Sequence, residues 1–238
     1  MKNVLAIARK YLKFKLTRHP SASAERQPPC AAPSAARMAH DLPLIIRNKA
    51  EFTMSNHDDS IVAAIIKCAN FAAIKHANQR RKDFEKTPYI NHPIGVANIL
   101  TDEGHVYDLD VIQAALLHDT VEDTDTTLDE IERHFGKTVR TIVDEVTDDK
   151  NLPKAERKRL QVVHAKTSSH NAKLVKLADK LYNLRDLERE TPEGWTQERV
   201  KEYFLWARDV VGNLSGTNEI LEQKLDEVLE RNIHKNTS

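Results

Sequence analysis

The chain of 238 residues has little cysteine, glycine or aromatic content, and each shortage excludes a class of protein. Its two cysteines, Cys30 and Cys68, form neither a disulfide framework nor a CxxC pair, so nothing indicates an oxidising compartment. With six glycines and 5% aromatic residues, but many Ala, Leu, Glu and Lys, the composition favours helices. No apolar run approaches the roughly 20 residues of a membrane span, so we expect no membrane segment.

The chain also lacks a net charge, but its charges are distributed unevenly. Of the 36 basic and 36 acidic side chains, residues 1–50 carry ten and two, which leaves 26 and 34 in residues 51–238. This acidic body argues against a general nucleic-acid-binding protein, because broad contact with phosphates requires a basic surface. A local basic pocket remains compatible with the composition.

Residues 1–57 differ in texture from the rest of the chain. Apolar residues recur at helical spacing among Lys and Arg through residue 19, and residues 20–38 are rich in Ser, Ala and Pro, which should not pack. This pattern is typical of a mitochondrial presequence, and equally of a disordered extension ahead of a translation start at Met54. We expect a disordered or weakly helical extension over 1–57, a folded domain over 58–231 and a tail over 232–238. The expected location is the cytoplasm, or the mitochondrion if residues 1–50 act as a presequence.

From residue 58 onward the apolar residues follow a helical period, and no segment has the alternation of a strand. The expected helices span 58–78, 93–101, 110–117, 128–135, 139–146, 153 onward, 168–190, 200–210 and 217–231. Asp58 or Ser60 can cap the first helix, and Ser168 or Ser169 can begin the long one. Cys68 is expected to be a buried thiol, and the polar run 154–159 to be a solvated face. The sequence therefore predicts an all-α fold, a single helical bundle.

Reactive side chains are most concentrated in residues 114–124. An apolar run ends at His118-Asp119, and Glu122-Asp123 follow within one turn. Imidazole with carboxylate suits Mn, Fe or Zn, and on a continuous helix Glu122 would share the face of the His-Asp pair. An isolated pair of this kind would more simply be a helix end followed by a solvated acidic turn, so partners elsewhere in the chain decide the matter.

Two such partners are His92 and Asp179. His92 lies in a rigid turn between Pro88 and Pro93, immediately before the helix that Pro93 begins. Asp179 falls among core leucines, where a carboxylate needs a cation or hydrogen bonds, and a metal satisfies it as simply as Lys or Arg does. The combined set binds one divalent ion and leaves positions open for water and substrate: His92, His118, Asp119 and Asp179.

Such an ion polarises a phosphoryl oxygen and lowers the pKa of bound water, generating hydroxide near neutral pH. Glu122 and Asp123 would then orient or deprotonate the water, or protonate the leaving oxygen. The sequence contains neither GxxxxGK(S/T) nor GxGxxG, so the metal and cationic side chains would hold the phosphates of a substrate. The candidate contacts are Arg80, Arg81 and Lys82 for phosphates, with Tyr89 and Asn183 for a base or sugar.

Four segments resemble the hydrolase domain of the RelA/SpoT enzymes, a branch of the HD-domain phosphohydrolases. They are Arg-Arg-Lys-Asp (80–83), Thr-Pro-Tyr-Ile-Asn-His-Pro (87–93), Ala-Leu-Leu-His-Asp-Thr-Val-Glu-Asp-Thr (115–124) and Lys-Leu-Ala-Asp-Lys-Leu-Tyr-Asn-Leu (176–184). They occur in order and at matching spacing, and the resemblance covers roughly 58–231. It is closest to the short, stand-alone metazoan SpoT homologues, but residues 1–57 match nothing in those enzymes.

The resemblance implies a helical domain with one Mn²⁺, held by His92, His118, Asp119 and Asp179. It implies Glu122 and Asp123 as catalytic acids and, less directly, substrate contacts from Arg81, Lys82, Tyr89 and Asn183. The implied reaction removes the 3′-pyrophosphate of (p)ppGpp to give GDP or GTP and pyrophosphate, without synthetase activity, as part of a stringent or starvation response.

Two alternatives are left open. The same machinery can act on another ribose-phosphorylated nucleotide such as NADPH, since metal and water do not dictate the base. A catalytically silent sensor would instead predict loss of a ligand or of the acidic pair, and neither is lost. The expected partner is a small-molecule nucleotide, with no nucleic acid and no membrane, and the sequence leaves the oligomeric state open.

Overall fold

The computed structural model describes residues 56–233, and the regular elements within this range are helices. They are α2 (Asn56–Lys75), α3 (Asn91–Asn98), the π-helix η2 (Ile99–Glu103), α4 (Leu109–Leu117), α5 (Thr120–Asp123), α6 (Leu128–Phe135), α7 (Lys137–Val146), α8 (Lys154–Ala165), α9 (His170–Arg189), α10 (Gln197–Gly212) and α11 (Glu219–Ile233). The predicted all-α fold is confirmed for these residues. The expectations for residues 1–55 and 234–238 lie outside the described part of the chain.

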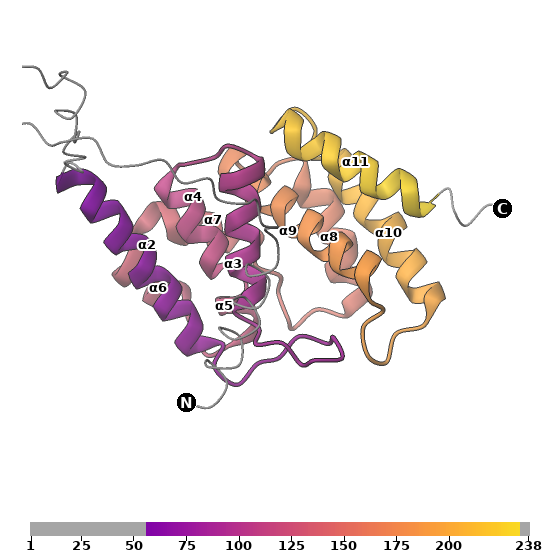
Figure 1. Cartoon of the computed structure of the whole chain (residues 1–238), viewed down its shortest axis with the longest axis horizontal. Helices are drawn as coiled ribbons and strands as arrows, with labels where there is room; N and C mark the ends of the chain where they lie inside the picture. Colours follow the sequence, from indigo (N-terminus) through magenta and orange to yellow (C-terminus); the bar gives the residue numbers. More distant parts are fainter. Residues whose placement is uncertain (1–55, 234–238) are drawn as a thin grey trace, which may run out of the picture. The chain divides into compact units, whose positions relative to one another are not determined.

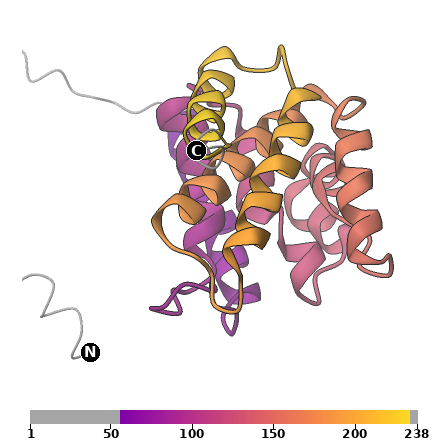
Figure 2. The ribbon, with the colours of Figure 1, turned by 90° about the vertical axis from the view of Figure 1, so that its right-hand side faces the viewer.

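Helices α4 and α9 lie at the centre of the domain, with other helices packed around them (Figure 1). Residues 111–117 of α4 are all buried, as expected for a helix that other helices cover on every side. α2, α3 and α7 pack against α4, while α3, α7, α10 and α11 pack against α9. Figure 2, with α10 and α11 toward the viewer, shows the same packing from the side. Side chains at the end of α4 and in the middle of α9 therefore lie deep in the molecule.

Helix α3 begins earlier than the sequence suggests. The amide of Asn91 donates to the carbonyl of Pro88, and that of His92 to the carbonyl of Tyr89, so a helical turn already closes before Pro93. The expectation that His92 lies in a turn ahead of the helix is therefore wrong, because His92 is the second residue of α3. Pro93 is tolerated there because N–H groups of the first turn have no partner inside the helix.

The other helix boundaries agree with the sequence predictions to different degrees. α2 starts at Asn56, so the prediction that Asp58 or Ser60 caps it is wrong. Ser169 does cap α9, because its hydroxyl accepts from the amide of Ala172 at 3.3 Å. α4 stops at Leu117, and a separate helical turn, α5, follows it instead of a continuous helix.

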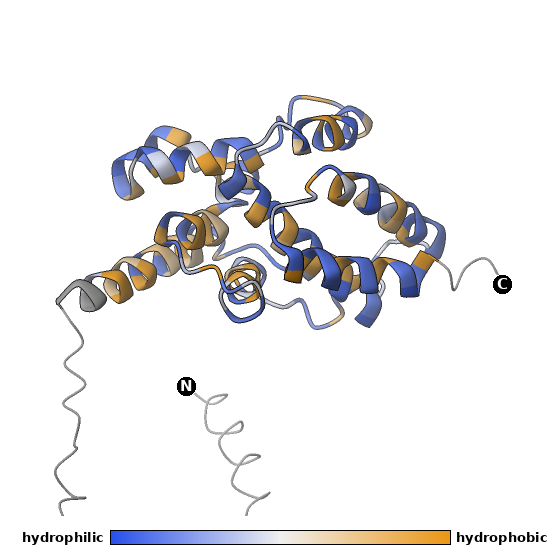
Figure 3. Cartoon of the chain, turned by 90° about the horizontal axis from the view of Figure 1, so that it is seen from above, coloured by the Kyte–Doolittle hydropathy of each residue, from blue (hydrophilic) through white to orange (hydrophobic). Residues whose placement is uncertain are grey.

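Helix α2 is apolar over much of its length (Figure 3). Its inner side covers α4 with Cys68 and Ala72, neither of which is exposed to solvent. The predicted burial of Cys68 is confirmed, and burial raises the pKa of its thiol to about 12, which leaves it an inert thiol at neutral pH. Among the helices of residues 56–233, none has the length and apolar content that would let it cross a membrane.

Candidate metal centre

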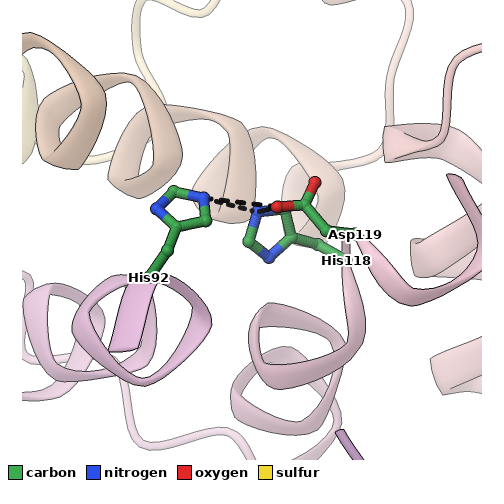
Figure 4. A group of neighbouring side chains, drawn as sticks. All are labelled: His92, His118 and Asp119. Carbon is green, nitrogen blue, oxygen red and sulfur yellow. Dashed lines mark hydrogen bonds and ion pairs between the residues drawn. The ribbon is translucent and has the colours of Figure 1, made fainter. Parts of the chain in front are cut away.

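Three helical segments bring two imidazoles and two carboxylates to one point. His92 comes from the first turn of α3, His118 and Asp119 from the end of α4, and Asp179 from the middle of α9. Figure 4 shows the side chains of His92, His118 and Asp119 turned toward one another. The four residues that the sequence singles out as candidate ligands, although up to 87 positions apart, therefore lie together in the fold.

The distances place the nitrogen and oxygen atoms of these groups around a common centre. The Nε2 atom of His92 lies 3.2 Å from Nε2 of His118, 3.4 Å from Oδ2 of Asp119 and 3.2 Å from Oδ1 of Asp179. The Nε2 atom of His118 lies 3.2 Å from Oδ2 of Asp119 and 3.7 Å from Oδ1 of Asp179. Both histidines are buried, so their nitrogen atoms face one another away from solvent.

This set of atoms fits a divalent metal ion. One candidate ligand atom each from His92, His118 and Asp119 lies within 4.8 Å of the others. The Oδ1 atom of Asp179 lies 3.2 Å and 3.7 Å from the Nε2 atoms of the two histidines. Two nitrogen and two oxygen ligands suit the divalent transition metals. Without a metal ion, the two partly buried carboxylates would face the same pair of imidazoles, and Lys180 would pair with Asp179 but not with Asp119, which leaves desolvation free energy uncompensated.

The environment holds the carboxylates of Asp119 and Asp179 in their ionised form. Although burial alone would raise the pKa of Asp179, the ammonium of Lys180 and the two histidines hold that pKa well below its usual range. Burial opposes ionisation of Asp119 as well, but His118 and His92 lower its pKa. Burial lowers the pKa of His92, which favours the neutral imidazole that binds metals.

Hydrogen bonds from neighbouring groups hold three of the four side chains in place. The Nδ1 atom of His118 donates to the carbonyl of Ala115 at 2.7 Å. The hydroxyl of Tyr89 donates to Oδ2 of Asp119 at 2.7 Å. Hydrogen bonds of this kind orient metal ligands and set their tautomers.

Asp179 is held on both of its oxygens. Its Oδ1 accepts from the amide of Asn183 at 2.6 Å, and its Oδ2 accepts from the ammonium of Lys180 at 2.8 Å. The sequence left open whether a lysine or a metal satisfies this buried carboxylate, and the geometry provides for both. Lys180 takes one oxygen, while the other oxygen faces the histidines.

The cluster forms one wall of a cavity of about 270 Å³. Seven of the ten site residues predicted from the sequence line it: Tyr89, His92, His118, Asp119, Glu122, Asp179 and Asn183. The other three, Arg81, Lys82 and Asp123, are not among the residues that line it. The roles of all ten residues remain predictions. The structure shows only which of the ten line the cavity.

Glu122 and Asp123 take different directions from the single turn of α5. Glu122 lines the cavity, where its Oε2 accepts from the amide of Asp148 at 3.2 Å and its Oε1 lies 3.5 Å from Arg157. Burial raises the pKa of Glu122, which brings it closer to the range of a group that exchanges protons. Asp123 instead accepts from the amide of Gln79 at 2.8 Å and pairs with Lys150.

The basic residues predicted to clamp phosphates have structural contacts of their own. Arg81 donates to Asn183 at 3.1 Å and to Asp186 at 2.7 Å. Arg80 donates to the carbonyls of Ala77 and Gln79, within its own segment. Arg81 therefore ties the loop before α3 to α9, next to the metal centre.

Another wall of the cavity was missed by sequence reasoning. Three cations of α8 line it: Lys154, Arg157 and Lys158. The interpretation of 154–159 as a solvated face is wrong for Arg157 and Lys158, which are half-buried in the lining, whereas Lys154 is exposed and the outer pair Glu156–Arg159 lies outside the cavity. The spacing of the three cations at i, i+3 and i+4 was a usable signal, because it places them on one face of the helix.

Other lining residues complete this wall. Lys176 of α9 has its pKa lowered to about 8 by burial and by the nearby charge of Lys180. Tyr203 and Trp206 of α10 also line the cavity, and the ammonium of Lys158 lies 4.8 Å from the centre of the Trp206 ring. The cavity thus combines a ligand cluster, several cations and two aromatic rings.

Comparisons with known proteins agree with this arrangement. The sequence profile of the HD domain matches residues 68–205. The guanosine-3′,5′-bis(diphosphate) 3′-pyrophosphohydrolase MESH1 of Xenopus tropicalis is 70% identical over 70% of this chain and 93% of its own length. The human protein of the same name is 68% identical over 70% of this chain and 93% of its own length.

A solved structure is similar as well. It is described as a metazoan orthologue of SpoT that hydrolyses ppGpp and plays a role in starvation responses. Its sequence is 56% identical, the TM-score is 0.70, and the match covers 71% of this chain and 95% of the other.

Proposed function

The chain belongs to the HD-domain family, and from this membership and the geometry of the cavity we propose that it hydrolyses the 3′-pyrophosphate of (p)ppGpp to give GDP or GTP and pyrophosphate. One observation carries the proposal: a metal-ligand cluster and a row of cations line the same cavity. Hydrolysis at the 3′-phosphorus needs both, because the pyrophosphate group is a polyanion and further charge develops as its bond to the ribose 3′-oxygen breaks.

The metal would be held by His92, His118, Asp119 and Asp179, and we propose Mn²⁺, one ion per chain. Two imidazoles and two carboxylates form a ligand set that Mn²⁺ accepts. When bound, a divalent ion in this position polarises a phosphoryl oxygen and lowers the pKa of a neighbouring water.

Glu122 is the group that we assign to proton transfer. It lines the cavity, and burial raises its pKa toward the range in which a carboxyl group both accepts and releases a proton. Its Oε2 is fixed by the amide of Asp148, so one oxygen remains on the side of Arg157. Asp123 keeps its place in the acidic pair through Lys150, whose ammonium approaches both carboxylates.

The cations of α8 supply the binding of the pyrophosphate. The pKa of Lys154 is lowered by burial and by the charges of Arg199, Lys82 and Arg157. Mutual repulsion of this kind marks a region of positive potential, and such a region attracts a polyanion. Lys82, although outside the lining, therefore contributes to the field at the cavity mouth.

The nucleoside would be bound by side chains with apolar faces and amide groups. The rings of Tyr203 and Trp206 have centres 5.0 Å apart, and Asn183 lines the same cavity from α9. The alternative substrate class, another ribose-phosphorylated nucleotide such as NADPH, is less favoured, because the similar proteins are named for hydrolysis of the guanosine bis(diphosphate).

The test is turnover by the purified full chain, stripped of metal and then given Mn²⁺, with ppGpp and NADPH offered in parallel. We expect equimolar GDP and pyrophosphate from ppGpp, with loss of turnover on chelation and in Asp119→Ala. Glu230→Gln, an exposed acid on α11, is the matched control and should be unaffected.

Faster release of orthophosphate from NADPH would replace the proposed substrate with the alternative. No turnover of either nucleotide by a folded, Mn²⁺-loaded chain would favour a sensor.

A further inference from the structure

The two histidines of the metal centre are held in different ways. The outer nitrogen of His118 donates to the carbonyl of Ala115 at 2.7 Å, which fixes its ring. The outer nitrogen of His92, Nδ1, is buried and has no hydrogen-bond partner among the described residues. Histidines that bind metals almost always donate their second N–H to an acceptor, so something else must orient His92.

Aromatic rings surround His92 in place of that acceptor. The centre of the Tyr182 ring lies 4.8 Å from that of His92, with 71° between the planes. The Tyr89 ring lies farther away, at 5.7 Å and 65°. Edge-to-face contacts of this kind are favourable and depend on geometry, so they restrict how the imidazole turns.

The Tyr182 ring reaches His92 only because residue 95 is a glycine. Gly95 follows His92 by three positions on α3 and so lies on the same side of that helix. A Cβ at position 95 would lie 2.7 Å from Cδ2 of Tyr182, and closer still to Cε2. Glycine inside a helix is destabilising relative to alanine, and close packing by Tyr182 is a physical reason for its presence here.

Arg81 lies against the same ring. The carbon of its guanidinium lies 5.7 Å from the centre of Tyr182 and 5.6 Å from that of Tyr89. The hydrogen bonds of Arg81 to Asn183 and Asp186 hold the guanidinium in this position. The two tyrosines next to His92 are thus tied to one cation.

We propose that Tyr182 is the positioning residue for His92, and that Gly95 is needed to admit its ring. The inference rests on the proposed function, because it takes His92 to be a metal ligand. Tyr182 contacts the imidazole from behind and does not line the catalytic cavity. Its role is to hold the Nε2 atom of His92 toward the other ligands, where His118 uses a hydrogen bond for the same purpose.

The local surroundings allow the proposal to be tested without unfolding the protein. Tyr182 and Gly95 border a cleft of about 410 Å³ between α3, η2 and α9, into which a displaced ring can move. A methyl group at position 95 should therefore shift Tyr182 away from His92 while the helices stay packed.

The experiment titrates Mn²⁺ into the metal-free full chain and follows the electron paramagnetic resonance signal of free Mn²⁺. Tyr182→Leu should weaken Mn²⁺ binding by roughly 10–100-fold, the usual effect of losing an outer-shell contact. Tyr182→Phe, which keeps the ring and lacks the hydroxyl, should bind Mn²⁺ as the parent chain does. Gly95→Ala should weaken binding, and adding it to Tyr182→Leu should cause little further loss, because the ring that it displaces is already absent.

Gly212→Ala is the matched control. Gly212 is also helical, but an added Cβ there meets nothing within 4 Å, so Mn²⁺ affinity should not change. Unaltered Mn²⁺ affinity in folded Tyr182→Leu and Gly95→Ala would overturn the proposal and leave the metal site standing. Failure of the parent chain to bind Mn²⁺ would overturn the metal site itself, and the positioning role with it.

Discussion

The two walls of the cavity carry their charges differently. On the metal wall the carboxylates of Asp119 and Asp179 accept hydrogen bonds from Tyr89, Asn183 and Lys180, and the imidazoles are buried. On the α8 wall, Lys154 is exposed and lies in a field of other cations. A buried cluster depends on each distance, whereas a group of solvated cations acts through its summed potential.

This difference predicts how each wall responds to change. Loss of one ligand leaves the remaining buried charges without compensation, so the effect should be large and confined to metal-dependent steps. Loss of one cation on α8 should lower the local positive potential only in part, because neighbouring cations remain and counter-ions screen exposed charges.

The largest effect is expected from His118→Ala or Asp119→Ala. Each removes a ligand from the buried cluster, so both bound metal and turnover of ppGpp should fall to background. Metal content by elemental analysis and pyrophosphate release measure the two losses separately. Substantial turnover by either variant in chelated buffer would show that the metal wall is not where catalysis is carried.

Next comes Glu122→Gln, which keeps the shape of the side chain and removes its proton chemistry. Metal content should be unchanged, while the turnover rate should fall by roughly 10²–10⁴-fold, as for other lost acid–base groups. Single-turnover kinetics at saturating Mn²⁺ measure this. A rate close to that of the parent chain would remove Glu122 from the mechanism.

A smaller effect is expected on the other wall from Lys154→Ala. KM for ppGpp should rise about tenfold, equivalent to roughly 1.4 kcal/mol, with kcat little changed, since the cation contributes to binding through the local potential. The increase should shrink at high salt because exposed charges are screened. Arg159→Ala, on the same helix but paired with Glu156 outside the cavity, is the control and should leave KM unaltered.

The last expected effect is on stability and not on catalysis: a pH dependence that arises from Lys176. Burial lowers the pKa of this lysine to about 8 in the folded chain, from 10.5 in the unfolded chain. Between these values the unfolded state binds more protons, so stability should rise with pH, by at most about 1.4 kcal/mol per pH unit.

Urea unfolding of the parent chain and of Lys176→Met at pH 7.5 and 9.5 measures this contribution. The gain in stability with pH should be larger in the parent chain. Equal pH slopes in the two proteins would mean that Lys176 is not desolvated in the cavity wall.

The sequence predicted helix boundaries correctly where capping residues mark both ends of the apolar pattern. α6 spans the predicted residues 128–135, since Thr127 caps its start and Gly136, at φ 91°, ends it. Boundaries were misjudged where a helix extends past its signals: α2 begins ahead of its predicted caps, and α3 begins two residues before Pro93. The π-helix after α3 has no sequence signature that we used, because it is a change in hydrogen-bond register and not in polarity.

By itself, the sequence determined the helical class and the identity of the four side chains that converge at the metal centre. It could do so because a carboxylate among leucines and a His-Asp pair at the end of an apolar run conflict with burial, and only a cation or hydrogen bonds resolve that conflict. The tertiary structure alone decided which charged face of α8 meets the cavity. Lys154 and Arg159 are both long cationic side chains on this helix, and only the packing of α8 places Lys154 in the lining and Arg159 outside it. It also decided that Gly95 receives the ring of Tyr182, because a contact between α3 and α9 exists only once the two helices are packed.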